Sequence, residues 1–265
     1  MIKVSFLSLL VFGFLGLTLW GCGPIERGQV YGEIDFKTQG TRIEEVDVDE
    51  GILVVNRAEL AFGPLYLCSG LQAGHLCETA RLEFVESKII DLLDDQEVTL
   101  GQLTGMSGLV QSWMFDLGIV STRTHSKPVV LESARDLGGH SFVLEGTLTF
   151  QGRSIPLTIA TALSQSDTTE QGVSLIRKSQ SESFRYTITK EQILGKDQRS
   201  MLMRFQFKDW LEILNFNRDL TAEKLDSLCP TSNECEEWVV EEESTLMRQV
   251  KTTLLTQMRP RFEYK

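Results

Sequence analysis

The chain has 265 residues, with 37 acidic against 26 basic side chains and a net charge of −11 at neutral pH. This balance excludes nucleic acid as the expected partner, because a nucleic-acid site needs a basic face. The same balance disfavours electrostatic adhesion to anionic lipid. The length of the chain fits one large β domain or two small ones.

The chain begins with a segment typical of a secretory signal peptide. Lys3 supplies a single positive charge, and Val4–Trp20 contains no charged residue. A basic start followed by a short apolar stretch is the layout of an export signal. A lone membrane anchor is the alternative, but glycines interrupt the run, no basic stop follows, and the stretch is shorter than a bilayer span.

The apolar run ends in Leu19-Trp20-Gly21-Cys22, which resembles the lipobox of bacterial lipoproteins. The resemblance implies cleavage after Gly21 and acylation of Cys22, and an ordinary cleaved signal is the alternative. Trp20 departs from the small or β-branched residue usual at its position. By resemblance to enterobacterial lipoproteins, Asp after the cysteine would favour inner-membrane retention. Gly23 stands there, so we expect an anchor in the outer membrane.

These signals predict three regions. Residues 1–21 form the signal peptide, and residues 22–40 form a lipidated tether that is rich in glycine and polar residues. Within the tether, one strand is expected over Val30–Phe36. Residues 41–265 form the folded β domain.

Alternation of apolar and polar residues predicts strands in most of that domain. The clearest pattern is a hairpin, in which Phe142–Phe150 and Ile155–Ile159 alternate on either side of a turn at Gln151-Gly152. Gly63-Pro64 predicts a bulge or bend in an earlier strand, since proline cannot donate to a ladder. Many short strands joined by turns predict a mainly β protein, an antiparallel β-sandwich with a few short helices.

Two helices are expected near the end of the chain. Residues 207–216 have the apolar spacing of about two helical turns. Ser244 caps a longer C-terminal helix, which stops at Arg259-Pro260. Its apolar stripe comprises Leu246, Met247, Val250, Leu254 and Met258. We expect this stripe to pack on the sandwich, with a partner-binding helix as the alternative.

Cysteine usage favours an oxidising compartment. Besides Cys22, the chain has an even number of cysteines: Cys68, Cys77, Cys229 and Cys235. Each neighbouring pair closes a short turn-rich loop, which favours local disulfides over crossed ones. A four-cysteine metal site is the rival interpretation, but no Cys-x-x-Cys spacing occurs.

No motif predicts catalysis, a cofactor or a metal centre. The three histidines, His75, His125 and His140, are not spaced as metal ligands. Residues 139–143 have Val143 where a nucleophile elbow needs glycine. Asp47–Gly51 has its glycine one position too early for a calcium loop. The acidic clusters, including residues 91–97, are interpreted as solvated charge.

Three stretches in the middle of the chain resemble exported bacterial β-sandwich lipoproteins of unknown function, and more distantly the methanobactin-associated periplasmic proteins. They are "AELAFGPLYLC", "IIDLLDDQEVTLGQLTGMSGLVQSWMFDLG" and "HSFVLEGTLTFQGRSIPLTI". The similarity lies in the order of these stretches and in their general pattern of residues, and it implies a β-sandwich fold. No ligand residue matches, so metal or methanobactin binding is not implied.

Together these features predict a non-enzymatic lipoprotein, anchored to the outer membrane through Cys22, with a binding or scaffolding domain in the cell envelope. The expected partners are the membrane, through the lipid, and an envelope protein. The alternative is a periplasmic metal- or small-ligand-binding lipoprotein that uses the histidines or the acidic loops.

Overall fold

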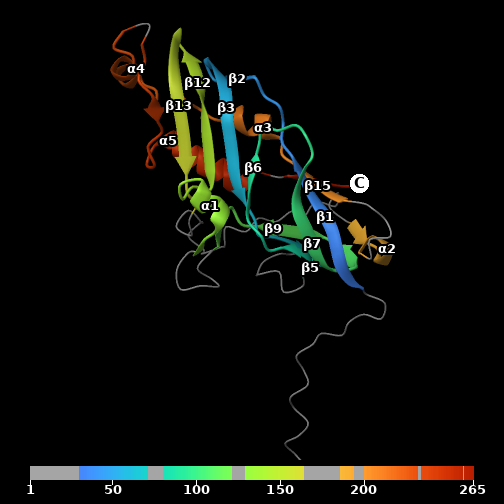
Figure 1. The fold of residues 1–265 in the computed structure, drawn as a ribbon. Helices are drawn as coiled ribbons and strands as arrows, with labels where there is room; N and C mark the ends of the chain where they lie inside the picture. Colours follow the sequence, from blue (N-terminus) through green and yellow to red (C-terminus); the bar gives the residue numbers. More distant parts are fainter. Residues whose placement is uncertain are drawn as a thin grey trace, which may run out of the picture.

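The computed structural model describes residues 30–70, 80–120, 129–163, 186–193, 200–231, 234–258 and 260–265. These residues form a mainly β fold with five short helices, one of them near the C-terminus, so the predicted fold class is confirmed. Most strands lie in two large sheets (Figure 1). The predicted signal peptide and Cys22 lie outside the described residues.

The first sheet has seven strands. Their order is β17 (Arg261–Tyr264), β15 (Ser200–Arg204), β1 (Tyr31–Gln39), β7 (Val98–Met106), β5 (Ala80–Phe84), β4 (Leu65–Cys68) and β9 (Ser112–Phe115). All pairs are antiparallel except β1 with β15. The parallel pair was not predicted, because hairpin signals report only on neighbouring strands of the chain.

Strand β1 corrects the predicted boundary between tether and domain. It lies inside the seven-stranded sheet, between β15 and β7, and buries Ile34 and Phe36. Residues 31–39 therefore belong to the folded domain, and of the range predicted as tether only residues 22–29 lie outside the described part. The physical reason is that this polar-looking segment still alternates, with every second residue facing the core.

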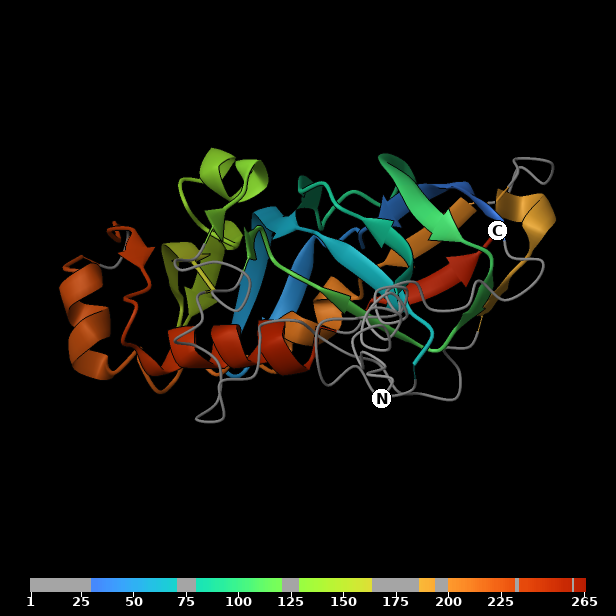
Figure 2. The ribbon, with the colours of Figure 1, turned by 90° about the horizontal axis from the view of Figure 1, so that it is seen from below.

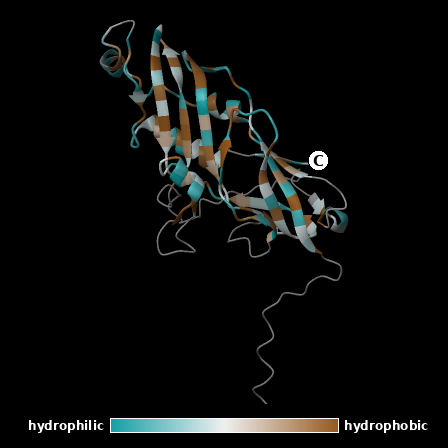
Figure 3. Ribbon diagram, viewed as in Figure 1, coloured by the Kyte–Doolittle hydropathy of each residue, from teal (hydrophilic) through white to brown (hydrophobic). Residues whose placement is uncertain are grey.

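The second sheet contains the predicted hairpin. Its strands are β16 (Trp238–Val239), β13 (Arg153–Thr161), β12 (Phe142–Phe150), β3 (Gly51–Phe62) and β2 (Glu45–Val48), with β6 (Lys88–Asp91) also paired to β3. Strands β12 and β13 meet at Gln151 and Gly152, both with positive φ, which is the geometry of a tight hairpin turn. The predicted hairpin is confirmed, and Figure 3 shows the alternation along its strands.

Gly63-Pro64 joins the two sheets. Strand β3 ends at Phe62 in the second sheet, and β4 begins at Leu65 in the first, with a cis peptide bond between Gly63 and Pro64. Around this crossover, phenylalanine rings from both sheets are in contact: the Phe62 centroid is 5.1 Å from Phe115 and 6.4 Å from Phe36. The predicted bend is therefore the point at which the chain changes sheet.

One face of the second sheet is covered by two of the helices. Helices α3 (Phe207–Leu211) and α5 (Thr245–Thr256) pack against β12 and β13, leaving a cavity of about 20 Å³ among apolar side chains. Figure 2 shows α5 running along this sheet. The C-terminal helix and its Ser244 cap are confirmed, and its apolar stripe packs on the sheet as expected.

The remaining elements are short. The helices are α1 (Glu132–Asp136), α2 (Lys190–Ile193) and α4 (Ala222–Leu228), and two small sheets pair β10 (Ile119–Val120) with β11 (Val129–Val130) and β14 (Tyr186–Ile188) with β8 (Gly108–Val110). Helix α1 covers part of the other face of the second sheet, against Ala61 and Val143. No helix in the described part of the chain has the length and apolar character needed to cross a membrane.

The start of α5 depends on a carboxylate that is distant in sequence. Asp219 accepts hydrogen bonds from the backbone N–H groups of Thr245 and Leu246, beside the Ser244 cap.

Asp219→Ala should lower the free energy of unfolding by about 2 kcal/mol, since two helix N–H groups lose a charged acceptor. Urea unfolding measures the change. Asp47→Ala, at an exposed position of β2, is the control and should change the free energy of unfolding by less than about 0.5 kcal/mol. Equal effects of the two substitutions would contradict the capping role.

Candidate functional site

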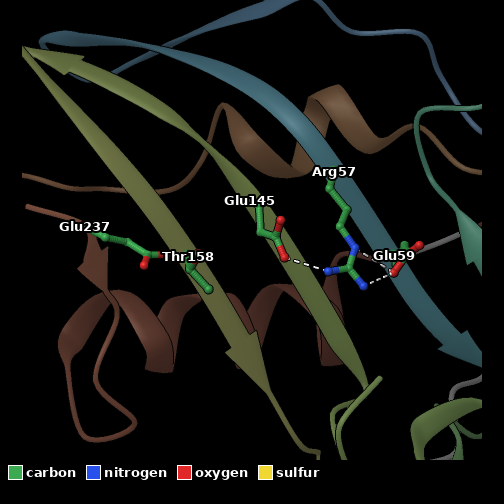
Figure 4. Close-up of polar contacts among 5 residues, drawn as sticks. All are labelled: Arg57, Glu59, Glu145, Thr158 and Glu237. Carbon is green, nitrogen blue, oxygen red and sulfur yellow. Dashed lines mark hydrogen bonds and ion pairs between the residues drawn. The ribbon is translucent and has the colours of Figure 1, made fainter. Parts of the chain in front are cut away.

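A row of linked polar side chains crosses the face of the second sheet that points away from α3 and α5 (Figure 4). Arg57 is its centre. The guanidinium donates through Nη1 to Glu145 Oε1 at 2.6 Å, and through Nε and Nη2 to Glu59 Oε2 at 2.8 and 2.6 Å. These hydrogen bonds, first to Glu59 and then to Glu145, raise the pKa of Arg57. Arg57 is therefore held in one orientation by two strands.

The strand register explains the row. Arg57 on β3 lies opposite Glu145 on β12, and Glu145 lies opposite Thr158 on β13. The Thr158 hydroxyl donates to Glu237 Oε1 at 2.6 Å, just before β16. Because directly opposed residues share a face, these side chains lie in one row across β3, β12 and β13, and the row ends at Glu237 before β16.

The row is acidic at its other end. Asp91 on β6 lies directly opposite Glu59 on β3, so two carboxylates share the same face. Arg57 is the only basic member of a row that also holds Asp91, Glu59, Glu145 and Glu237. Its charge is already matched by Glu59 and Glu145, and the face is negative overall.

Asp91 also lines a cavity of about 150 Å³ at the junction of the two sheets. The cavity lies between the end of β1, strand β6 and the loop that leads into β7. Its wall is formed by Thr38, Gln39, Gly40, Ile89, Ile90, Asp91, Asp94, Gln96, Val98 and Leu100. It combines acidic and amide side chains with an apolar side, and no lysine or arginine is among these residues.

Backbone hydrogen bonds fix the loop that forms the acidic side of this cavity. The N–H of Gly40 donates to Asp94 O at 2.7 Å, and that of Thr41 donates to Leu92 O at 2.9 Å. A Cβ atom on Gly40 would lie 2.4 Å from Leu92 O, so the close approach of the two segments requires glycine. The side-chain amide of Gln39 adds a bond to Asp95 O at 2.5 Å.

Both acidic side chains in the wall are held by the loop itself. Asp91 Oδ1 accepts the N–H of Leu93, and Asp94 Oδ1 accepts the N–H of Gln96, each at 2.9 Å. Each aspartate therefore binds its own backbone two residues on, as in Asx turns. This anchors one carboxylate oxygen and leaves the second oxygen available as an acceptor.

Two further oxygens of the wall residues have no hydrogen-bond partner. Thr38 Oγ1 and Gln39 Oε1 are buried and unpaired, and Thr38 as a whole is 4% exposed. Buried polar atoms in folded proteins are nearly always paired, so each exception needs an explanation. Here both exceptions belong to neighbouring residues of the same cavity wall.

A buried carboxyl oxygen without a partner lies just after β9. Asp116 is 3% exposed, and its Oδ1 has no partner. Burial raises the pKa of this carboxyl to about 7. Burial first, and then the nearby carboxylates of Asp116 and Glu83, raise the pKa of Tyr66. The backbone of Asp116 is bonded to Gly63 and Pro64, so the carboxyl is fixed beside the crossover between the sheets.

The predicted cysteine residues are placed in part. Cys229 and Cys235 form a disulfide with an S–S distance of 1.99 Å, as local pairing predicted. Cys68 is disulfide-bonded as well. Cys77 and Cys22 lie outside the described residues, so the pairing of Cys77 and the acylation of Cys22 stay predictions.

Two motifs that resemble functional loops have structural roles. Asp49, in the predicted acidic turn, accepts the N–H of Phe216 at 2.8 Å, which ties the β2–β3 turn to a distant segment. Ser141, at the serine position of the incomplete nucleophile elbow, is buried and accepts the N–H of Leu163 at 3.1 Å. Both side chains are used to hold loops in place.

The histidines are not brought together by the part of the chain that the structure describes. His140 follows α1 and its Nδ1 is buried without a partner, while His75 and His125 lie outside the described residues. Among the described side chains, no three of His, Cys, Asp or Glu are grouped as a metal site would need.

Sequence reasoning missed the cavity because it interpreted residues 91–97 as solvated charge. The sequence contained one local signal. Asp91 and Asp94 each stand two residues before the residue whose N–H they accept, which is the spacing of Asx turns. That spacing indicates a structured loop. It does not reveal that Gln39 and Gly40 form the opposite wall.

Comparisons of the chain with models of known families, with curated proteins and with solved structures found no match.

The buried carboxyl of Asp116 should make stability depend on pH. Its folded pKa of about 7 lies above the 3.8 that is usual for an aspartate, so the folded state binds more protons between these pH values, and stability falls as pH rises from about 4 to about 7. This decrease should be about 4 kcal/mol. Urea unfolding from pH 3 to pH 8 should show it in the wild type but not in Asp116→Asn.

The control for this experiment is Asp136→Asn, at the exposed end of α1, which should keep the pH profile of the wild type. Parallel profiles of the wild type and Asp116→Asn over this range would show that folding leaves the pKa of the Asp116 carboxyl unchanged, and would contradict the effect of burial.

Proposed function

We propose that this chain is an outer-membrane-anchored lipoprotein, held by acyl chains on Cys22, with a non-enzymatic β domain that binds a partner in the cell envelope. Three kinds of observation support the proposal. They are the resemblance of Leu19–Cys22 to a lipobox, the oxidised cysteines, and the cavity with its adjoining polar row.

The disulfide supports export. Cys229 and Cys235 are joined, and Cys68 is disulfide-bonded too. Disulfides persist in oxidising compartments such as the periplasm and the cell surface, and they are rare in the cytosol. A chain with a lipobox at the end of an export signal would reach such a compartment.

The cavity is the observation that carries the binding part of the proposal. Its wall is held by backbone hydrogen bonds from Gly40 and Thr41, and it combines the polar side chains of Asp91, Asp94 and Gln96 with apolar ones. A fixed wall of mixed character is suited to holding a ligand group without rearrangement. The Arg57 row next to it offers a wider polar surface to the rest of a partner.

The non-enzymatic part of the proposal is supported by what the candidate reactive side chains do. The hydroxyl of Ser141 and the carboxylate of Asp49 both accept backbone N–H groups. Both contacts are structural, since each holds a loop to a segment that is distant in sequence. The alternative, a periplasmic metal- or small-ligand-binding lipoprotein, shares the cavity, and its metal form requires ligands beyond the described residues.

Anchoring predicts a defined mass and location. Full-length protein purified from a bacterial envelope should begin at Cys22, carry acyl mass and gain four protons on reduction of two disulfides. Cys22→Ala should lose the acyl mass and leave the membrane fraction. The Cys229→Ser/Cys235→Ser double variant is the control, because it should keep the anchor and gain only two protons. An unacylated wild-type chain would overturn the proposed anchor.

Binding at the cavity predicts site-specific cross-links in intact envelopes. A photo-reactive amino acid at Gln96, an exposed residue of the cavity wall, should give a light-dependent adduct of defined mass. The control position is Glu223, exposed on α4 beyond β13 (Figure 1), which should give none. Equal labelling at both positions, or none at Gln96, would count against a binding site at the cavity.

A further inference from the structure

We propose that the outer face of the second sheet, which points away from α3 and α5, docks a partner protein whose contact surface has apolar side chains surrounded by lysine or arginine. This inference rests on the proposed binding function and adds a surface and the chemistry of its partner. Strand register defines the surface, because it places side chains of β2, β3, β12 and β13 in consecutive rows on one face.

The two rows nearest the β12–β13 turn have apolar side chains on this outer face. Ile52 and Val54 of β3 are 40% and 38% exposed. Thr149 and Thr147 of β12 lie directly opposite them, and the exposed Pro156 of β13 lies opposite Thr147. Adjoining exposed apolar side chains with a polar rim are typical of protein–protein contacts. We call Ile52, Val54 and Pro156 the apolar strip.

Carboxylates border the apolar strip. Glu45 and Asp47 of β2 lie opposite Val54 and Ile52, and Glu145 lies in the next row. Glu45 and Asp47 are both exposed. Within the described part of the chain, neither of them takes part in an ion pair. Their charge is therefore available to cationic side chains that approach from outside.

The charge of the face selects among the possible occupants. A second copy of the chain would bring the same carboxylates against it, and anionic lipid headgroups would be repelled as well. Among the described side chains of these rows, Arg57 is the only basic one, and it is already bonded to Glu59 and Glu145. Lysine or arginine side chains of a partner protein complement this face, and such complementarity orients a docked protein.

The size of the face also disfavours a stable dimer. Three rows are open, since the next row is covered by α1, which packs against Val143. With about 4.8 Å between strands and about 6.8 Å between alternate residues, three rows on four strands cover about 400 Å². A standard interface buries about 800 Å² on each partner, so this face suits a weak or transient contact.

The edges of the sheet favour docking on the face over addition of a strand. At one edge, β2 has only four residues. At the other edge, β13 contains Pro156 and pairs with β16 only at Leu157 and Thr158. Short edge strands and proline hinder pairing with another chain. The partner is therefore expected to make its contacts through side chains.

Binding of three eight-residue peptides to the full-length protein in phosphatidylcholine discs tests the inference, with empty discs as the blank. A peptide of alternating lysine and valine should bind. A lysine–serine peptide should bind about fivefold more weakly, because it lacks apolar area, and a glutamate–valine peptide should not bind. High salt should weaken binding of the lysine–valine peptide, because exposed charges are screened.

Two variants locate the contact. Val54→Ser should weaken binding of the lysine–valine peptide by about threefold, since it removes apolar area from the strip. Glu45→Gln/Asp47→Asn should weaken it by about five- to tenfold, since two exposed carboxylates lose their charge. All three positions are exposed, so both variants should fold, and unchanged melting temperatures verify this.

The controls make the same chemical changes elsewhere. Val85→Ser alters a 64% exposed valine between β5 and β6, and Asp209→Asn/Glu223→Gln removes two exposed charges from α3 and α4. Both should bind the lysine–valine peptide as the wild type does. Equal losses in the controls, or equal binding of the lysine–serine or glutamate–valine peptide, would overturn the inference. Binding to phosphatidylglycerol vesicles or self-association that Val54→Ser abolishes would overturn it too.

Cross-linking separates failure of this inference from failure of the proposed function. A photo-reactive amino acid at the exposed Thr149 should give an adduct in intact envelopes, and excess lysine–valine peptide should reduce its yield. An adduct at Thr149 that the peptide leaves unchanged would overturn the stated chemistry. An adduct at Gln96 without one at Thr149, in a protein that binds no peptide, would keep the proposed function and reject this docking face. Absence of both adducts would reject both.

Discussion

The contact between phenylalanine rings at the crossover from β3 to β4 is the constraint on which the rest of the structure depends. Phe62 ends the long strand of one sheet, and its ring contacts Phe115 and Phe36 of the other sheet and Phe205, at the end of β15. Phe36 in turn contacts Phe84 at 5.2 Å. Burying several aromatic rings together stabilises the fold by more than any single surface contact does. The relative position of the two sheets is therefore fixed at this crossover.

That fixed position creates the cavity. Where the sheets meet, Gly40 and Thr41 at the end of β1 are hydrogen-bonded to the segment that follows β6. Next to these hydrogen bonds, the side chains of β1 and of the loop leave a cavity of about 150 Å³. Within the second sheet, the pairing of β6 with β3 places Asp91 of the cavity opposite Glu59 of the Arg57 row. The cavity therefore depends on the packing of the two sheets, and the row depends on the strand register inside one of them.

Local patterns predicted the parts of the fold that are built from neighbouring residues. The β12–β13 hairpin follows from alternation and from a turn that only residues tolerant of positive φ can form, and the start of α5 follows from the hydroxyl of Ser244. The parallel pairing of β1 with β15 and the docking of Gly40 on Leu92 join segments far apart in the chain. No local signal reports such contacts, which is why β1 was assigned to the tether and the acidic loop to solvent.

The charge of the domain and the proposed anchor are consistent with each other. A chain of net charge −11 is repelled by anionic lipid headgroups, so attraction to the membrane surface cannot hold it there, and a covalent lipid would. The same negative field raises the local concentration of cations at the acidic face. On the outer face of the second sheet, Glu59 and Glu145 outnumber Arg57, and Asp91 adds a further carboxylate beside Glu59, so this face has an excess of negative charge.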